Sequence, residues 1–335
     1  MAGVPGNIAD MPFALQSAKG SAASASQWRL WLAGGSAPHS VMVKEDFEET
    51  TGARMLSDSY VSESHVEGEP DLFLMPVSAV PLIYGVLGAK AVSGASDPYT
   101  HTLTVATSVP YFTFWQSLGA GKFEKFKDCI ITGLKIRGES GKPLIITPRI
   151  MGLSPSYLAA AETTVAVEKT NRFMHYDGSA ALKVEGTAVA SMRSFEIDID
   201  NGAEVIPGDS LHPTDVSIGR LSIVVTATML VEDFDLWERL MYASSTPSGG
   251  DAVTKTPLEL AGSPAGLSFT WTRVATTRIL TAAIPRVQVD PFDDQPDVSG
   301  NPLVRTLTYR AYAPTDGSTP ATFSMKNATA SYAAA

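Results

Sequence analysis

The stretch Phe195-Glu196-Ile197-Asp198-Ile199-Asp200 alternates strictly between apolar and acidic residues. Because successive side chains of a strand point to opposite faces, this period of two predicts a β-strand with one apolar face and one acidic face. That pattern is typical of an antiparallel sheet with one wet side. The acidic side chains are Glu196, Asp198 and Asp200. Carboxylates about 7 Å apart along a strand repel one another, so their face must be open to water or line an aqueous lumen.

Outward from this stretch, segments with the composition of strands dominate the chain, and most are bounded by Gly, Pro, Asn or Asp. The predicted strands are 28–32, 41–45, 99–107, 111–115, 129–137, 144–151, 195–200, 220–231, 267–274, 278–290 and 303–312. The predicted fold is therefore all-β with short flanking helices, built from packed antiparallel sheets in a sandwich-like or barrel-like arrangement.

Two short helices interrupt the strands. The first is predicted to start after Ser78 as N-cap and to end at Gly88. The second is predicted from Asp233 to Ser244, about 155 positions later, and each follows an extended run and precedes pairs of strands. The repeated order predicts a tandem duplication within one chain. Its parts are a flexible N-terminal arm (1–27), a first half (28–165), a second half (166–330) and a tail (331–335).

Composition excludes several classes of function. The formal charge of -10 argues against a surface that attracts nucleic acid, and only 18% of residues are charged, as expected of a subunit that buries surface against its neighbours. The single Cys129 lies in an apolar run, which indicates a buried, inert thiol. No stretch is long enough for a membrane span, and the N-terminus lacks the pattern of a signal peptide. The Ala/Gly/Ser-rich residues 1–27 and the loop 36–52 are expected to be ordered by neighbouring subunits.

Candidate sites for chemistry are weak. The five histidines lack metal-ligand spacing, and no nucleophile signature is present, so we predict no catalytic residue, no metal, no cofactor and no enzymatic activity. Gly119 to Lys122 departs from the phosphate-binding pattern and reads as a loop. Asp290 to Asp297 lacks calcium-loop spacing, so a solvated acidic loop is preferred over a cation site. The aromatic run 111–115 has no interleaved basic residues and is assigned to core or interface packing.

Four segments together resemble the major tail tube proteins of long-tailed bacteriophages. They are Asp71-Leu72-Phe73-Leu74-Met75-Pro76, Val86-Leu87-Gly88-Ala89, His101-Thr102-Leu103-Thr104 and 126–136. The resemblance covers roughly residues 55–330. It implies packed antiparallel sheets with a flanking helix, and rings whose inner sheets join into one β-lined lumen through which DNA passes. The duplication resembles the variant in which three chains, each with two tube domains, replace six.

The resemblance implies a structural virion protein of the phage tail, assembled in the host cytoplasm into stacked rings with tail terminator and tail-tip partners. Its lumen would be lined by Glu196, Asp198 and Asp200, which repel phosphate and let double-stranded DNA pass without specific binding. Trimeric rings with pseudo-sixfold symmetry are expected, with hexameric rings as the alternative. The same acidic face on an ordinary solvated sheet is the competing interpretation. Two other classes of function stay open: another phage structural protein, such as a head decoration or tail terminator protein, and a carbohydrate-binding or hydrolytic β-sandwich.

Overall fold

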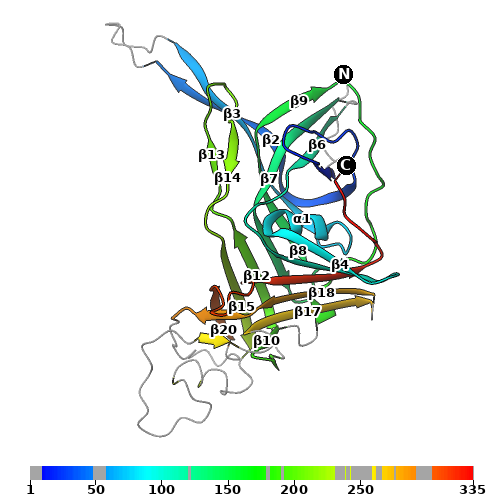
Figure 1. Cartoon of the computed structure of the whole chain (residues 1–335), viewed down its shortest axis with the longest axis vertical. Coiled ribbons are helices and arrows are strands. Elements are labelled where there is room, and N and C mark those ends of the chain that lie inside the picture. The colour runs from blue at the N-terminus through cyan, green and yellow to red at the C-terminus, as the bar shows by residue number, and fades with distance from the viewer. Residues whose placement is uncertain are drawn as a thin grey trace.

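Two packed antiparallel sheets make up nearly all of the structure, which is a computed structural model (Figure 1). It describes residues 10–47, 58–119, 122–178, 182–189, 192–230, 238, 242, 259–261, 266–274, 277–291 and 304–334. The all-β fold with a short flanking helix, predicted from the alternating segments, is confirmed.

The larger sheet has 12 strands in the order β16-β19-β20-β15-β12-β7-β6-β1-β2-β3-β8, with β9 paired to β7. Their bounds are β1 Asp10–Leu15, β2 Trp28–Asp46, β3 Ser59–Phe73, β6 Phe112–Gly119, β7 Lys122–Glu139, β8 Ile145–Gly152, β9 Ser154–Leu158, β12 Met192–Asp200, β15 Ser222–Leu230, β16 Glu259–Ala261, β19 Arg286–Val289 and β20 Val304–Ala311. The first half of β7 pairs with β6, and its second half pairs with both β8 and β12. Strand β7 therefore connects the strands on its two sides into one sheet.

Eight neighbouring strands of the large sheet repeat one order. On one side of the β7–β12 junction the order is β2-β3-β8-β7, and on the other side it is β12-β15-β20-β19. The first two strands of each set along the chain, β2 and β3 or β12 and β15, pair antiparallel. The chain then leaves the set and returns with a second antiparallel pair, β7 and β8 or β19 and β20. The later strand of that second pair, β8 or β20, lies next to β3 or β15. We call these the first set and the second set. They lie edge to edge, since β7 and β12 pair from Gly133↔Asp200 to Glu139↔Ser194.

The second sheet has seven strands in the order β11-β10-β17-β18-β21-β5-β4. Their bounds are β4 Gly88–Ser93, β5 Tyr99–Val105, β10 Leu182–Val184, β11 Thr187–Ala188, β17 Leu267–Val274, β18 Arg278–Ile284 and β21 Thr322–Asn327. The core between the two sheets is continuous and includes Ile136, Leu307 and Trp271. A separate hairpin, β13 Glu204–Ile206 with β14 Asp215–Ser217, extends the β12–β15 connection, and a 3₁₀ turn η1 spans His175–Gly178.

The one α-helix with described bounds, α1, spans Ala79–Leu87 and confirms the first predicted helix. Gly88 ends it in the left-handed conformation at φ 93°, which a glycine adopts without strain. The side chain of Ser78 does not cap the helix itself, because its hydroxyl donates to Glu168, whose carboxylate also accepts the amides of Val77 and Ser78 at 3.1 and 2.8 Å. The second predicted helix, 233–244, lies outside the described residues except Glu238 and Tyr242, which are helical.

The prediction of a flexible arm over residues 1–27 is wrong for its described part. Strand β1 is fully buried between β2 and β6, because Met11, Phe13 and Leu15 supply apolar side chains that the Ala/Gly/Ser-rich average of this segment conceals. Residues 1–9 lie outside the described residues. The predicted loop 36–52 is likewise strand as far as Asp46, since β2 continues through its irregular register between Ser36 and His39.

The predicted tail 331–335 also packs against the body of the protein. The ring of Tyr332 lies 5.7 Å from that of Trp28, and its hydroxyl donates to the carbonyl of Val77 at 2.9 Å. Two other predictions about buried groups are confirmed. Cys129 is completely buried, which raises the pKa of its thiol, and the aromatic side chains of Phe112, Phe114 and Trp115 are core residues.

Candidate functional site: the polar face of the large sheet

Strand β12 divides its side chains as its sequence predicts. Phe195, Ile197 and Ile199 are at most 3% exposed and pack into the core between the sheets. Glu196 and its two acidic neighbours are half-buried on the opposite face. The aromatic ring of Phe195 stacks on that of Trp271 at 4.8 Å, which fixes the register of the strand against the second sheet.

The acidic side chains belong to a larger surface, which we call the polar face. It runs across both sets of strands on the side away from the second sheet. Its members on the central strands are Asp71, Lys135, Arg137, Thr147, Arg149, Ser194, Glu196, Asp198, Asp200, Thr226, Thr228, Thr306, Thr308 and Arg310, aligned by cross-strand register. Four of these side chains are acidic and four are basic, and Glu69 of β3 and Glu139 of β7 lie on the same face by register, so acids outnumber bases on the polar face.

Arg149 of β8 connects the two sets of strands. Its guanidinium pairs with Asp198 and with Asp200, the latter at 2.5 Å, although β7 lies between β8 and β12. Gly133 of β7 makes this reach possible: a Cβ there would lie 2.6 Å from the Nε atom of Arg149 and 2.9 Å from the carbonyl oxygen of Ile199. Any side chain at position 133 would therefore displace the guanidinium from its two carboxylates.

A second group of charges lies beside the first. Arg137 donates to Asp71 at 2.7 Å, and the hydroxyl of Thr147 donates to the other oxygen of the same carboxylate at 2.5 Å. Lys135 lies 3.9 Å from Asp198. The charged side chains of these pairs are partly exposed, so each ion pair contributes little to stability, and the main consequence is that the cations are already neutralised.

These contacts correct one expectation. The acidic row of β12 is not uncompensated, since Asp198 and Asp200 share Arg149, and only Glu196 makes no hydrogen bond or ion pair with a described residue. Sequence reasoning missed the cations because they come from other strands. The signal was present, since Leu134-Lys135-Ile136-Arg137 and the residues around Arg149 alternate between apolar and polar just as β12 does.

Other candidate sites carry no chemistry within the described part of the chain. No group of three or more His, Cys, Asp or Glu residues there is arranged to hold a metal ion. Asp290 binds Arg310 at 2.8 Å, and residues 292–297 of the predicted acidic loop lie outside the described residues. Gly119 and Lys122 are paired strand residues at the end of the β6–β7 hairpin, and residues 120–121 between them lie outside the described residues. None of the described helices is long and apolar enough to span a membrane.

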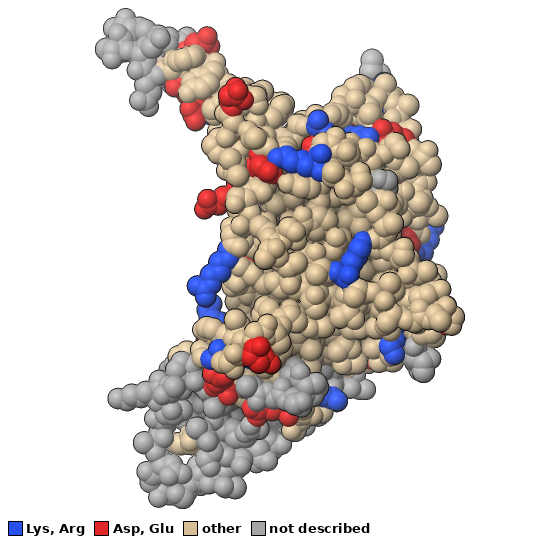
Figure 2. Space-filling view, viewed as in Figure 1, with Lys and Arg blue, Asp and Glu red and all other residues tan. Residues whose placement is uncertain are grey.

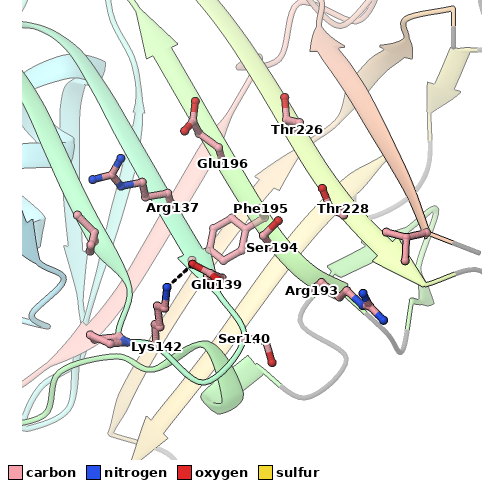
Figure 3. Close-up of a pocket in the computed structure, with 14 residues that line it drawn as sticks. Arg137, Glu139, Ser140, Lys142, Arg193, Ser194, Phe195, Glu196, Thr226 and Thr228 are labelled. Atoms are coloured by element: carbon pink, nitrogen blue, oxygen red, sulfur yellow. Dashed lines mark hydrogen bonds and ion pairs between the residues drawn. The ribbon is translucent and has the colours of Figure 1, made fainter. Parts of the chain in front are cut away.

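A hollow of about 700 Å³ lies at one end of the polar face, where the β7–β8 hairpin meets the ends of β12 and β15 (Figure 3). Its apolar lining comes from Pro143, Ile145, Phe195 and Val304. Arg137, Lys142 and Arg193 bring positive charge to it, and Lys142 is bound to Glu139 at 2.7 Å. No catalytic arrangement is formed by these groups.

The comparisons with known proteins agree with this architecture. No curated protein matches the chain. Residues 45–328 match the family described as phage tail tube protein, a range that covers most of the chain and includes both sets of strands except nearly all of β2. Tail tube proteins are structural components of the virion tail. On this match, and with two packed antiparallel sheets and a broad polar face in place, the chain belongs to the phage tail tube protein family.

Proposed function

We propose that this protein self-assembles into stacked rings that form the tail tube, and that the polar face lines the lumen through which DNA leaves the phage. The observation that carries the proposal is the repeated strand order, β2-β3-β8-β7 followed by β12-β15-β20-β19, with one continuous polar face. We interpret the two sets as two tube-like halves, 28–165 and 166–330, in a tandem duplication. A surface that is polar on one side and fully packed on the other suits the inner layer of a water-filled tube.

The width of the sheet favours three chains per ring over six. Eight strands about 4.8 Å apart cover roughly 38 Å of arc, so three chains whose strands follow the tube axis close a ring roughly 37 Å across between backbones. Inward side chains occupy roughly 10 Å of that diameter, which leaves room for one hydrated duplex. Six such chains would give a ring about twice as wide. Trimeric rings with pseudo-sixfold symmetry are therefore part of the proposal.

Strand β2 offers the edge at which one chain joins the next. From Leu32 to Asp46 it pairs with β3 on one side, and no described strand pairs with its other edge. An unpaired edge is a template for another strand. By analogy with the β7–β12 junction inside the chain, this edge is proposed to meet the other end of the sheet in a neighbouring chain, where β16 pairs with β19 beyond the second set.

The charges of the polar face suit a wall that does not hold DNA. A free cation binds phosphate and releases counterions, which would slow the duplex. Arg149 and Arg137 are each held by carboxylates of their own chain, so they are not free for phosphate. Glu196 adds a negative charge that repels DNA. In this proposal the acids of β12 act mainly by occupying the arginines, and no catalytic activity is assigned to the protein.

Electron microscopy of the purified protein tests the proposal against its alternatives. We expect long hollow tubes or stacks of rings, formed without other tail proteins. A tail terminator would give single rings, and a head decoration protein or a carbohydrate-binding module would give small oligomers or monomers. Tail terminator and tail-tip proteins are proposed as the partners at the two ends of the tube, which assembles in the host cytoplasm.

Cysteine labelling of tubes tests the lumen assignment. Glu196→Cys places a thiol on the polar face, and Ser324→Cys is the matched control on the outward side of β21 in the second sheet. The native Cys129 is buried and contributes no background. A small maleimide should label both variants, whereas a maleimide on a bead wider than the tube should label only Ser324→Cys. Labelling of Glu196→Cys by the bead would place the polar face outside and contradict the proposal.

Charge variants test the electrostatic part. Asp198→Asn with Asp200→Asn leaves Arg149 without its carboxylates, whereas Glu196→Gln removes one negative charge and frees no arginine. We expect the double variant to retain DNA in its tubes and to slow ejection, and the control to differ little from wild type. The logarithm of DNA affinity should fall against the logarithm of salt concentration with a slope of about 0.9 for each phosphate that an arginine neutralises. Replacement of Glu196, Asp198 and Asp200 by Lys should slow ejection further. Unchanged ejection in every variant would contradict the role given to these acids.

A further inference from the structure

The two sets of strands meet inside the chain by direct pairing of β7 with β12. This junction runs over seven residue pairs, from Gly133↔Asp200 to Glu139↔Ser194, and no strand lies between the two. By their order in the sheet, β19 of the second set corresponds to β7, and β2 of the first set corresponds to β12. A ring whose junction between chains repeats the junction within the chain therefore pairs β19 of one chain directly with β2 of the next.

In the single chain, this edge of β19 is already occupied by β16. The three residues of β16 pair with β19 from Glu259↔Gln288 to Ala261↔Arg286, and β16 ends the large sheet within the described part of the chain. It thus stands in the place that the analogy gives to the β2 of a neighbour. A very short edge strand is one way in which proteins protect a sheet from pairing with another chain.

Few contacts hold β16 against β19. Leu260 is 1% exposed and packs into the core, opposite Val287. On the other side, the guanidinium of Arg286 donates to both carboxylate oxygens of Glu259, at 2.8 and 2.9 Å. This ion pair is partly exposed and contributes little to stability. A strand held by three residue pairs, the Leu260 side chain and an exposed ion pair can separate from β19 without unfolding of the whole sheet.

Strand β2 offers β19 a longer partner than β16 does. From Leu32 to Asp46, one edge of β2 pairs with no described strand. This edge is long enough to pair with all of β19, Arg286–Val289, whereas β16 covers only three of its residues. Exchange of β16 for β2 therefore extends the ladder of backbone hydrogen bonds at this end of the sheet.

The β2–β3 hairpin also carries the charge that Arg286 needs after it loses Glu259. Figure 2 shows acidic side chains along the projecting part of this hairpin. Glu69 of β3, one strand in from the β2 edge, is exposed and makes no hydrogen bond or ion pair with a described residue. Arg149 already reaches carboxylates across one intervening strand within the chain. The neighbouring chain thus has a surface complementary in charge to the uncovered β19.

We propose that β16 covers the assembly edge of the free chain, and that β2 of the neighbouring chain in the ring displaces it and pairs directly with β19. The proposal rests on the tube assembly described above. Only chains whose β16 has separated from β19 can join at this edge. The concentration needed for assembly is therefore raised in inverse proportion to the fraction of chains that are uncovered, and a weaker cover makes assembly easier.

A reversible lock tests the displacement. Glu259→Cys combined with Gln288→Cys puts two thiols on directly opposed residues of β16 and β19, about 5 Å apart at their Cα atoms, which a disulfide can span. The native Cys129 is buried and takes no part. We expect the oxidised variant to fold, by circular dichroism, but to give neither rings nor tubes, and a reductant to restore both.

The control for the lock is Thr102→Cys with Ser324→Cys, which joins opposed residues of β5 and β21 in the second sheet. This control should assemble equally well when oxidised and when reduced. Rings or tubes formed by the oxidised Glu259→Cys, Gln288→Cys variant would show that β16 stays in place during assembly and would overturn the proposal. Failure of the wild-type protein to form tubes would instead contradict the proposed function itself.

A weakened cover should have the opposite effect to the lock. Leu260→Ala removes the apolar side chain that anchors β16, and Leu280→Ala, at a fully buried position of β18, is the matched control. Both variants lose stability, but only the first uncovers β19. We expect Leu260→Ala to lower the critical concentration for assembly about tenfold, and Leu280→Ala not to lower it. A critical concentration of Leu260→Ala at or above that of the wild type would overturn the proposal.

Discussion

The hairpins that open the two sets of strands hold the same place in the sheet but have different surroundings. The outer part of the β2–β3 hairpin, residues 41–47 and 58–63, projects from the body of the protein with its apolar side chains exposed (Figure 1). The β12–β15 connection, extended by β13 and β14, instead lies against the first set: the amide of Ser64 donates to the carbonyl of Leu211 at 2.8 Å, and Val216 packs with Ile130 and Leu153. The β12–β15 connection finds hydrogen-bond and packing partners within its own chain, whereas the apolar side chains in the outer part of the β2–β3 hairpin stay exposed. In the proposed tube, a neighbouring chain is expected to contact the β2–β3 hairpin.

The largest effect is expected at the junction between the two sets. Gly133→Val puts a branched side chain where a Cβ already lies 2.6 Å from Arg149, so it should separate the guanidinium from Asp198 and Asp200 and strain the β7–β12 pairing. We expect a loss of about 3 kcal/mol in the free energy of unfolding, measured in urea. Ala91→Val, on the exposed strand β4, is the control and should change stability by less than about 0.5 kcal/mol. Equal stability of the two variants would mean that the junction tolerates a side chain.

A matched pair of valines compares the two hairpins directly. Val216 is 8% exposed and Val61 is 42% exposed. Val216→Ser should cost about 2 kcal/mol of stability, because it removes buried apolar contacts and buries a hydroxyl, whereas Val61→Ser should cost less than about 0.5 kcal/mol. In tube assembly the order should reverse, with Val61→Ser the more harmful. If both variants lose the same stability, the outer part of the β2–β3 hairpin is packed in the isolated chain and the comparison fails.

The smallest effect concerns Glu168, which lies between the two sets in sequence and binds the start of α1. Burial raises the pKa of its carboxyl. A raised pKa in the folded state means that stability is fully present below the ordinary pKa of about 4.3 and declines as pH rises through the raised value. Glu168→Gln cannot ionise, so its unfolding free energy should depend less on pH above the ordinary pKa of a glutamate. Parallel pH profiles for the two proteins would show that Glu168 ionises in the folded state as easily as in the unfolded chain.

Much of the fold could be predicted from local pattern. The alternation at Phe195–Asp200, the glycine at position 88 and the segments around the β7–β8 hairpin all specify their own structure through side-chain period or backbone conformation. Strand β1 was missed because its short apolar run lies within a segment whose average composition is that of a flexible arm. The apolar residues of this one short strand were averaged with those of a much longer Ala/Gly/Ser-rich segment, so the average did not show the strand.

The candidate site was predicted only in part, for a different reason. The side of β12 that carries the acids follows from its own sequence, but the partners of those acids do not. Arg149 reaches them from about fifty positions away, across a strand whose Gly133 leaves the space. No local rule connects these three positions, since the contact depends on the order of strands in the sheet. The exposed aromatic pair Phe47 and Tyr60 likewise gains meaning only once the hairpin is seen to project.

The central claim is that two sets of strands in one chain form two sixths of a tube wall with the polar face inward. Electron cryomicroscopy of tubes assembled from the purified protein tests it most directly, because it gives the number of chains per ring and the side that faces the lumen. The account predicts three chains per ring, with Glu196 and Arg149 toward the lumen and the β2 edge against a neighbouring chain. Six chains per ring, or a polar face on the outer surface, would contradict it.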